Sequence, residues 1–187
     1  MSYLPGQTRA ATDAALVGRS DYAPRVADLW RRHFLDSAQL RPLVPDDTQS
    51  LIDLGSGAGF PGLVLAILGV PGVELVEADS RKSAFLREAA RVTKANVTIR
   101  TCRAAAVPPH PVDVVTARAL APLDRLLDLA QPFLRGDTVC LFPKGEQAAA
   151  ELTLARKRWT MTVALHNSIA DPRGVVLRLH QVVREPR

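Results

Sequence analysis

The stretch from Leu51 to Ala66, LIDLGSGAGFPGLVLA, constrains the fold more than any other part of this sequence. It begins with a short apolar run, which predicts a buried strand, and passes through closely spaced glycines into a second apolar segment, which predicts a helix. Glycines at such a turn let the backbone approach a ligand, and backbone N–H groups at a helix start can face it. The stretch therefore predicts a strand, a loop and a helix that together bind a cosubstrate.

The glycine spacing alone leaves the class of cosubstrate open. Gly57, Gly59 and Gly62 satisfy the G-x-G-x-x-G pattern of dinucleotide sites, which is a weak signal by itself. Asp53, two positions before Gly55, extends the pattern to D-x-G-x-G-x-G, which resembles the first motif of the Rossmann-like S-adenosylmethionine methyltransferases. A carboxylate there would repel the pyrophosphate of a nicotinamide cofactor. The motif favours S-adenosylmethionine, with a nicotinamide-dependent oxidoreductase as the alternative.

The composition is that of an ordinary folded domain. Of 187 residues, 47% are hydrophobic and 23% charged, which argues against a largely disordered chain. No apolar run approaches the roughly 20 residues that span a bilayer, and the first residues lack the apolar core of a signal peptide, so we expect a cytoplasmic protein. Cys102 and Cys140 predict buried thiols, and no cluster at metal-ligand spacing accompanies them, so we expect no metal site.

The net charge of +5 permits a polyanionic partner without requiring one. Basic residues gather in three clusters, at 31–33, at 81–87 and at 156–158. Each cluster could be a solvated surface. The first two become candidates for nucleic-acid contact if the fold places them beside the glycine-rich loop.

Strand-like and helix-like segments alternate along most of the chain. A helix is predicted from Pro24 to about Leu40, a second over 80–93 with Phe85, Leu86, Ala89 and Val92 as its apolar stripe, and a third over 123–134. Strands are predicted at 51–54, 73–77, 97–101, 112–116 and 138–142, and an antiparallel pair at 159–168 and 175–183.

This alternation predicts an α/β fold, a doubly wound Rossmann-like sheet that is mostly parallel and ends in an antiparallel strand pair. Such an ending is typical of the methyltransferases, whereas a dehydrogenase usually continues with parallel strands. We expect residues 1–45 to form a short helical lead-in and residues 46–187 to form the cosubstrate-binding domain.

Three polar residues follow the predicted strands, where ligands bind in such sheets. Glu77 closes the second strand, 20 residues after Gly57, where a carboxylate can accept hydrogen bonds from both ribose hydroxyls of an adenosine. Arg118 follows the fourth strand and Lys144 the fifth. We expect both basic side chains to lie at the lip of the same crevice.

The segments WRRHFLDSAQL, DLGSGAGFPG, EADSRKSAFL, TARALAPL and FPKG, in this order and spacing, resemble the RsmG family, also called glucose-inhibited division protein B. Its members are bacterial enzymes that methylate N7 of one guanine in 16S ribosomal RNA. The resemblance implies S-adenosylmethionine contacts at Gly55, at Phe60, at the backbone of Ala104 and Ala105, and at Arg118. Ala105 stands where the family commonly has an acidic residue, so only a backbone contact is expected there.

The proposed chemistry needs few residues, because guanine N7 carries a free lone pair and no base must remove a proton. The enzyme has to position N7 in line with the methyl group and exclude water. We hypothesise that Arg118 lies at the methyl-transfer centre, where it orients the cosubstrate carboxylate or guanine O6. The remaining candidates contact 16S RNA or the small ribosomal subunit: Arg31, Arg32, Lys82 and Lys144 at the RNA, and His33 and Ser37 at the substrate entrance.

Two alternatives stay open besides the oxidoreductase. One is an S-adenosylmethionine-dependent enzyme with another nucleic-acid or small-molecule substrate. The other is a non-enzymatic RNA-binding assembly protein, which would lack cosubstrate affinity. We expect a monomer in each case.

Overall fold

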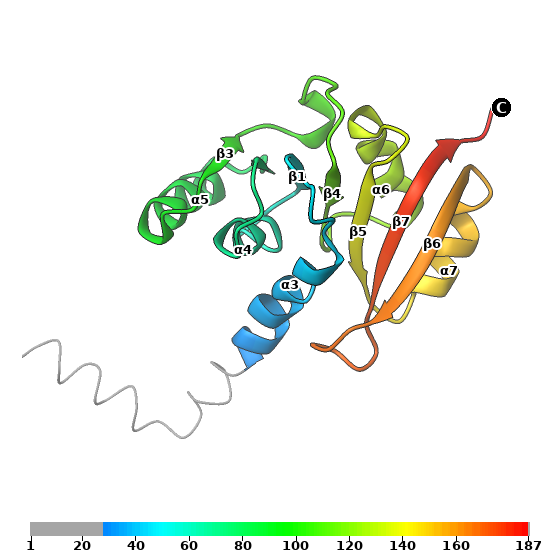
Figure 1. Cartoon of the computed structure of the whole chain (residues 1–187), viewed down its shortest axis with the longest axis horizontal. Coiled ribbons are helices and arrows are strands. Elements are labelled where there is room, and N and C mark those ends of the chain that lie inside the picture. Colours follow the sequence, from blue (N-terminus) through cyan, green and yellow to red (C-terminus); the bar gives the residue numbers. More distant parts are fainter. Residues whose placement is uncertain (1–27, 187) are drawn as a thin grey trace, which may run out of the picture.

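The computed structural model of the chain describes residues 28–186. Seven strands form one sheet in the order β3-β2-β1-β4-β5-β7-β6 (Figure 1). The strands are β1 (Leu51–Leu54), β2 (Val73–Val76), β3 (Val97–Arg100), β4 (Val114–Thr116), β5 (Val139–Lys144), β6 (Trp159–Asn167) and β7 (Val175–Arg184). The first five are parallel, and β7 pairs antiparallel with both β5 and β6. The predicted mostly parallel sheet with an antiparallel ending is confirmed.

Helices connect the strands in the order predicted for a doubly wound sheet. They are η1 (Trp30–Leu35), α3 (Asp36–Ala38), η2 (Arg41–Leu43), α4 (Gly62–Ile67), α5 (Ser80–Thr93), η3 (Ala104–Ala106), α6 (Leu123–Ala130), η4 (Gln131–Phe133) and α7 (Ala148–Ala155). We call η1 and α3 together the η1–α3 helix. Pro24 and the predicted lead-in before residue 28 lie outside the described residues.

Two predictions for the helices need correction, and one helix was missed. The segment predicted as one helix over 123–134 is α6 followed by the tighter turn η4, because Pro132 lacks the N–H that a continued helix requires. Helix α7 was not predicted. In α5, Phe85 and Val92 are exposed, and the buried face consists of Ser83, Leu86 and Ala90. Asp79 caps α5, since its carboxylate accepts from the amides of the first turn.

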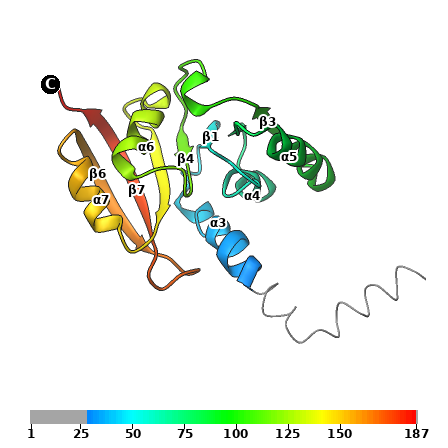
Figure 2. The ribbon, with the colours of Figure 1, turned by 180° about the vertical axis from the view of Figure 1, so that it is seen from behind.

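The sheet is covered on both faces, and successive strand residues point to opposite cores. Ile52 and Leu54 of β1 belong to the core formed with α6 and α7. Leu51 belongs to the core formed with α4 and α5. Seen from either side, α4 and α5 lie toward β3, and α6 and α7 lie toward β6 (Figures 1 and 2). Strand β1 is therefore fully buried, as its continuous apolar run predicts.

The two cysteines differ in their surroundings. Cys140 lies in the core, and burial raises the pKa of its thiol to about 12. Cys102 is only partly buried, so the prediction of two buried thiols holds for Cys140 alone.

Candidate functional site

The carboxyl ends of the parallel strands meet at one edge of the sheet. The glycine-rich loop follows β1, Glu77 follows β2, and Arg118 follows β4. Helix η3 follows β3 and carries Ala104 and Ala105, with Ala105 exposed. The structure thus brings the predicted cosubstrate residues to the edge where ligands bind in open α/β sheets.

Asp53 supports the loop from below. Its side chain is fully buried, and its carboxylate accepts from the Thr116 hydroxyl at 2.8 Å and from the Gly62 amide at 3.2 Å. Burial raises the pKa of Asp53, although these hydrogen bonds oppose the rise. The carboxylate therefore fixes the start of α4 and does not face the crevice, in contrast to the direct cosubstrate contact expected from the sequence.

Gly62 must be a glycine for steric reasons. A Cβ built on it would lie 2.5 Å from Leu75 Cδ2 and 2.6 Å from Asp53 Cβ. Both neighbours are buried, so neither has room to move. Helix α4 consequently packs directly onto β1 and β2, and this packing fixes the position of the glycine-rich loop relative to the sheet.

Glu77 is bound to the glycine-rich loop. Its side chain is only 8% exposed, and Oε2 accepts from the Gly57 amide at 2.8 Å while Oε1 accepts from the Asp79 amide at 2.8 Å. A carboxylate has about four acceptor positions, so capacity remains for two ribose hydroxyls.

The same contact bears on the class of cosubstrate. In a dinucleotide site the amides of this loop bind a pyrophosphate, whereas here the Gly57 amide already donates a hydrogen bond to the Glu77 carboxylate. The negative charge of Glu77 at that amide would repel a second anion. The arrangement fits an adenosine whose remaining group is cationic, as in S-adenosylmethionine.

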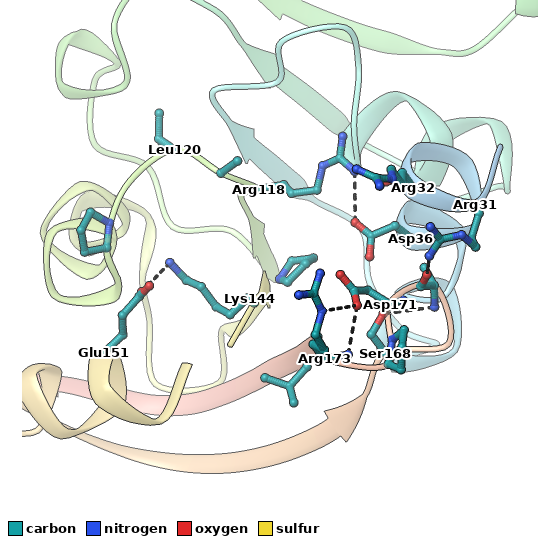
Figure 3. A pocket seen from close by; sticks show the side chains of 18 of the residues that line it. Arg31, Arg32, Asp36, Arg118, Leu120, Lys144, Glu151, Ser168, Asp171 and Arg173 are labelled. Carbon is teal, nitrogen blue, oxygen red and sulfur yellow. Dashed lines mark hydrogen bonds and ion pairs between the residues drawn. The ribbon is translucent and has the colours of Figure 1, made fainter. Parts of the chain in front are cut away.

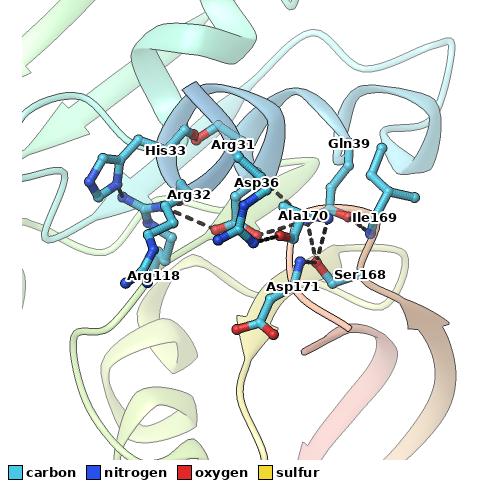
Figure 4. A network of polar contacts seen from close by, with 11 residues as sticks. Arg31, Arg32, His33, Asp36, Gln39, Arg118, Ser168, Ile169, Ala170 and Asp171 are labelled. Atoms are coloured by element: carbon cyan, nitrogen blue, oxygen red, sulfur yellow. Dashed lines mark hydrogen bonds and ion pairs between the residues drawn. The ribbon is translucent and has the colours of Figure 1, made fainter. Parts of the chain in front are cut away.

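Arg118 is held by the η1–α3 helix (Figure 4). Its Nη1 donates to the Arg32 carbonyl at 2.8 Å and to Asp36 Oδ2 at 3.0 Å, and its Nη2 lies 3.0 Å from His33 Nδ1. The guanidinium carbon lies 5.3 Å from the centre of the Phe60 ring. Arg118 thus joins the η1–α3 helix to the glycine-rich loop.

Aromatic side chains complete this junction. The Phe60 ring stacks on His33 at 5.2 Å and meets the edge of Phe34 at 5.2 Å. Trp30 lies 4.4 Å from Phe34 and is 59% exposed. The loop residue Phe60 is therefore covered by the η1–α3 helix. From the sequence, the residues of this helix were expected to contact only the substrate.

A cavity of about 790 Å³ opens beside the loop (Figure 3). It lies between the η1–α3 helix, the β4–α6 loop, the end of β5 and the β6–β7 turn, and Leu120 lines it. A Cβ built on Gly55 would lie 2.7 Å from Leu120 Cδ1, so Leu120 touches both the cavity and the glycine-rich loop. Its charged lining consists of Arg31, Arg32, Arg118, Lys144, Arg173, Asp36, Glu151 and Asp171.

The predicted RNA-contact residues fall into different places. Arg31 and Arg32 line the cavity, whereas Lys82 lies outside it, exposed in the first turn of α5. Lys144 also lines the cavity, but its ammonium is bound to Glu151 at 2.8 Å, and its side chain is 10% exposed.

Ser37 is fully buried, and its hydroxyl donates to the His33 carbonyl at 2.6 Å. The hydroxyl therefore stabilises the helix and does not shape the cavity entrance. Asp36, which the sequence places as an i,i+4 neighbour of Arg32, instead pairs with Arg118, and Arg32 pairs with Asp28 at 2.8 Å.

Gln39 and Arg173 were missed by the sequence reasoning. Gln39 bonds Ser168 and Ile169 across about 130 positions of sequence, and no local pattern signals so distant a contact. Arg173 belongs to a turn that the sequence does predict, but only the fold places that turn at the cavity.

No helix of the described residues is both long and apolar enough to cross a membrane. Across residues 28–186, no group of three or more His, Cys, Asp or Glu side chains is placed to hold a metal ion.

Solved structures of methyltransferases share this fold. The ribosomal protein L11 methylase from Lactobacillus delbrueckii matches with a TM-score of 0.64 and 16% identity over 78% of each chain. Magnesium protoporphyrin IX methyltransferase from Synechocystis, with bound S-adenosylmethionine, matches with a TM-score of 0.61 and 13% identity over 79% of each chain. The chain therefore has the Rossmann-like fold of these methyltransferases.

The family model for rRNA small subunit methyltransferase G matches residues 8–175. The chain belongs to this family, which confirms the resemblance read from its motifs. The relative from Rhodospirillum rubrum is 59% identical over 157 residues, which are 84% of this chain and 78% of the relative. The relative from Gluconobacter oxydans is 48% identical over 163 residues, which are 87% of this chain and 84% of the relative.

Proposed function

We propose that this protein transfers a methyl group from S-adenosylmethionine to N7 of a guanine in 16S ribosomal RNA. One observation carries the proposal beyond the family name: the positively lined cavity adjoins the glycine-rich loop through Leu120, which contacts Gly55. A nucleotide in the cavity would thus lie beside the cosubstrate. The names of the relatives, ribosomal RNA small subunit methyltransferase G, support the choice of RNA.

The residues that would hold S-adenosylmethionine are Gly55, Gly57, Gly59 and Phe60 of the loop, Glu77, and the backbone of Ala104 and Ala105. When bound, this cosubstrate supplies a methyl group on a cationic sulfur. Glu77, which is bound to the Gly57 amide, would accept hydrogen bonds from the ribose. Asp53 would hold the loop in place by accepting from the Gly62 amide. Guanine N7 has a free lone pair, so positioning is the main requirement on the protein.

Arg118 serves that positioning. A guanidinium has five N–H donors, and the bonds to Asp36, the Arg32 carbonyl and His33 occupy only some of them. The remaining donors are available to the carboxylate of the cosubstrate or to guanine O6. Because Asp36 and Phe60 fix the guanidinium, it is ordered before either ligand arrives.

Arg31 and Arg32 contact phosphates of the RNA from the cavity rim in this proposal. The side chain of Arg32 is 65% exposed and its only side-chain partner among residues 28–186 is Asp28, so its guanidinium can donate to a phosphate in place of that carboxylate. Lys82 and Lys144 are weaker candidates, since one lies away from the cavity and the other is paired and largely buried.

We further propose that the protein acts as a monomer in the cytoplasm, where ribosomal RNA is found. Residues 1–45 would form a lead-in that completes the site, and residues 46–187 would form the catalytic domain. The contacts of the η1–α3 helix with Arg118 and Phe60 support this division of roles.

The decisive experiment combines the protein with methyl-labelled S-adenosylmethionine and small subunits that lack the modification, and then maps the labelled base. Label at N7 of a single guanine is the expected result. Arg118→Ala should lose transfer, whereas Arg91→Ala, which changes an exposed arginine on α5, should retain it. Cosubstrate binding without any label on RNA would exclude the proposed substrate, and RNA binding without cosubstrate affinity would favour an assembly protein.

A further inference from the structure

The β6–β7 turn, residues 168–174, is fastened to the η1–α3 helix (Figure 4). Gln39 Oε1 accepts from the Ile169 amide at 2.9 Å, and Gln39 Nε2 donates to Ser168 Oγ at 3.1 Å. The Arg31 guanidinium donates to the carbonyl of Ala170, a residue that is only 3% exposed. The turn therefore has a fixed place beside the carboxyl end of β5 and forms one wall of the cavity.

Hydrogen bonds within the turn give its tip a defined shape. Ser168 Oγ accepts from the amides of Ala170 and Asp171, both at 3.1 Å. The Gly174 amide donates to the Asp171 carbonyl at 2.9 Å, and the Arg173 amide donates to Asp171 Oδ1 at 3.0 Å. The backbone that carries Arg173 is thus ordered, although the side chain itself is not buried.

The side chain of Arg173 is 70% exposed, and its ion-pair partners among residues 28–186 are exposed carboxylates. It lies 2.9 Å from Glu146, whose side chain is 64% exposed, and 3.7 Å from Asp171. Exposed ion pairs of this kind contribute about 0–1 kcal/mol, so a phosphate group can replace either carboxylate.

Asp171 lies among three arginines from two elements. The hydrogen bond from the Arg173 amide lowers the pKa of Asp171, and the charges of Arg173, Arg31 and Arg32 lower it further. Arg173 of the turn and the two helix arginines line the same cavity. Asp171 is the negative group that partly offsets them.

We propose that the β6–β7 turn is a second RNA-contact element, in which Arg173 binds a backbone phosphate next to those bound by Arg31 and Arg32. This inference rests on the proposed function, because it takes RNA as the substrate. Phosphate contacts fix the position of a nucleic acid without reading its sequence. The turn and the helix arginines would thus hold neighbouring phosphates of the same strand at the cavity rim.

The test compares the salt dependence of binding to unmodified 16S ribosomal RNA for Arg173→Gln and the wild type. Loss of one phosphate contact reduces the magnitude of the slope of log K against log salt by about 0.7–0.9, which at 0.1 M salt corresponds to about five- to eightfold weaker binding. Cosubstrate affinity and Tm should stay unchanged. Arg91→Gln is the matched control, because Arg91 is 72% exposed and paired with Glu88 on α5, away from the cavity.

Asp171→Asn tests the same idea in the opposite direction. The asparagine oxygen can still accept from the Arg173 amide, so the turn is retained while the negative charge is removed. RNA binding should tighten by a similar factor and its salt dependence should steepen. An unchanged slope in Arg173→Gln, or an equal change in Arg91→Gln, would overturn the inference.

The outcomes also separate this inference from the proposed function. If the wild type methylates the small subunit and Arg173→Gln leaves the slope unaltered, only the inference is wrong. If the slope falls as expected while no methyl group is transferred, the turn binds RNA and the proposed reaction is wrong.

Discussion

Asp36 Oδ2 and Arg118 Nη1 lie 3.0 Å apart, and their side chains are only 17% and 18% exposed. They come from opposite sides of the glycine-rich loop in sequence, 82 positions apart. The pair therefore fixes the η1–α3 helix against the loop after β4, and with it the position of the guanidinium that we place at the reacting groups.

This ion pair predicts strong coupling between the two residues. In a double-mutant cycle with Asp36→Asn and Arg118→Gln, we expect a coupling energy of about 1–2 kcal/mol, because a partly buried charged hydrogen bond is lost in either single variant. Urea unfolding of the four proteins measures it. Additive effects would show that the pair contributes nothing to stability, and Arg118 would then need another means of orientation.

Gly62→Ala should damage the loop as well as the core. The added methyl group meets Leu75 and Asp53 at distances that no core tolerates, so we expect a loss of about 1–3 kcal/mol in unfolding free energy. Gly136→Ala is the control, because nothing lies within 4 Å of its added Cβ. Thermal unfolding checks the difference, and equal Tm values for the two variants would contradict the close packing of α4.

Glu77→Gln should separate cosubstrate binding from RNA binding. Glutamine has one acceptor oxygen, so either the Gly57 or the Asp79 amide loses its partner, at a cost of about 1–3 kcal/mol. We expect S-adenosylhomocysteine to bind at least about tenfold more weakly in calorimetry. Glu88→Gln, which alters a side chain that is 61% exposed on α5, should bind like the wild type. Normal affinity in Glu77→Gln would remove this residue from the cosubstrate site.

Asp113 predicts a defined pH dependence of stability. Burial alone would raise its pKa, but hydrogen bonds from the Gln49 amide and from Ser50, with the charge of Arg135, outweigh burial and lower it. A lowered pKa stabilises the fold above the unfolded value of about 3.9, and this contribution is lost as the pH falls through the folded value. Asp113→Asn should therefore destabilise the protein by about 1–3 kcal/mol at pH 7 and by progressively less below pH 4.

Asp137→Asn is the control for this series, because Asp137 also pairs with Arg135 but is 76% exposed. Urea unfolding between pH 3 and pH 7 follows both variants. A constant difference between Asp113→Asn and the wild type across that range would show that the charge of Asp113 is not responsible.

The sheet could be predicted because its signals are local. The bounds of β1 and of α5 follow from an apolar run and from a capping aspartate, which need no information from distant residues. Helix α7 escaped prediction because its apolar residues do not gather on one side: Leu152 is buried while Leu154 is 55% exposed. A helix without a clear apolar face gives no periodic signal.

The site could be predicted only in part, and for a related reason. Glu77 follows from its position after β2, whereas the burial of Asp53 depends on how closely α4 approaches β1. The partners of Asp36 and Gln39 depend on the fold, since they lie in elements that are 82 and about 130 positions away. Motif reasoning finds residues that face a ligand more readily than residues that hold other residues.

Strand β7 lies between β5 and β6, although it follows both in sequence. During translation the N-terminal parts of a chain emerge first, at about 5–20 residues per second. Strand β6 therefore leaves the ribosome before the strand that joins it to the sheet, and the β6–β7 turn reaches its place only after β7 is made. A nascent chain can form the glycine-rich loop early, but it cannot complete the cavity until β7 has been made.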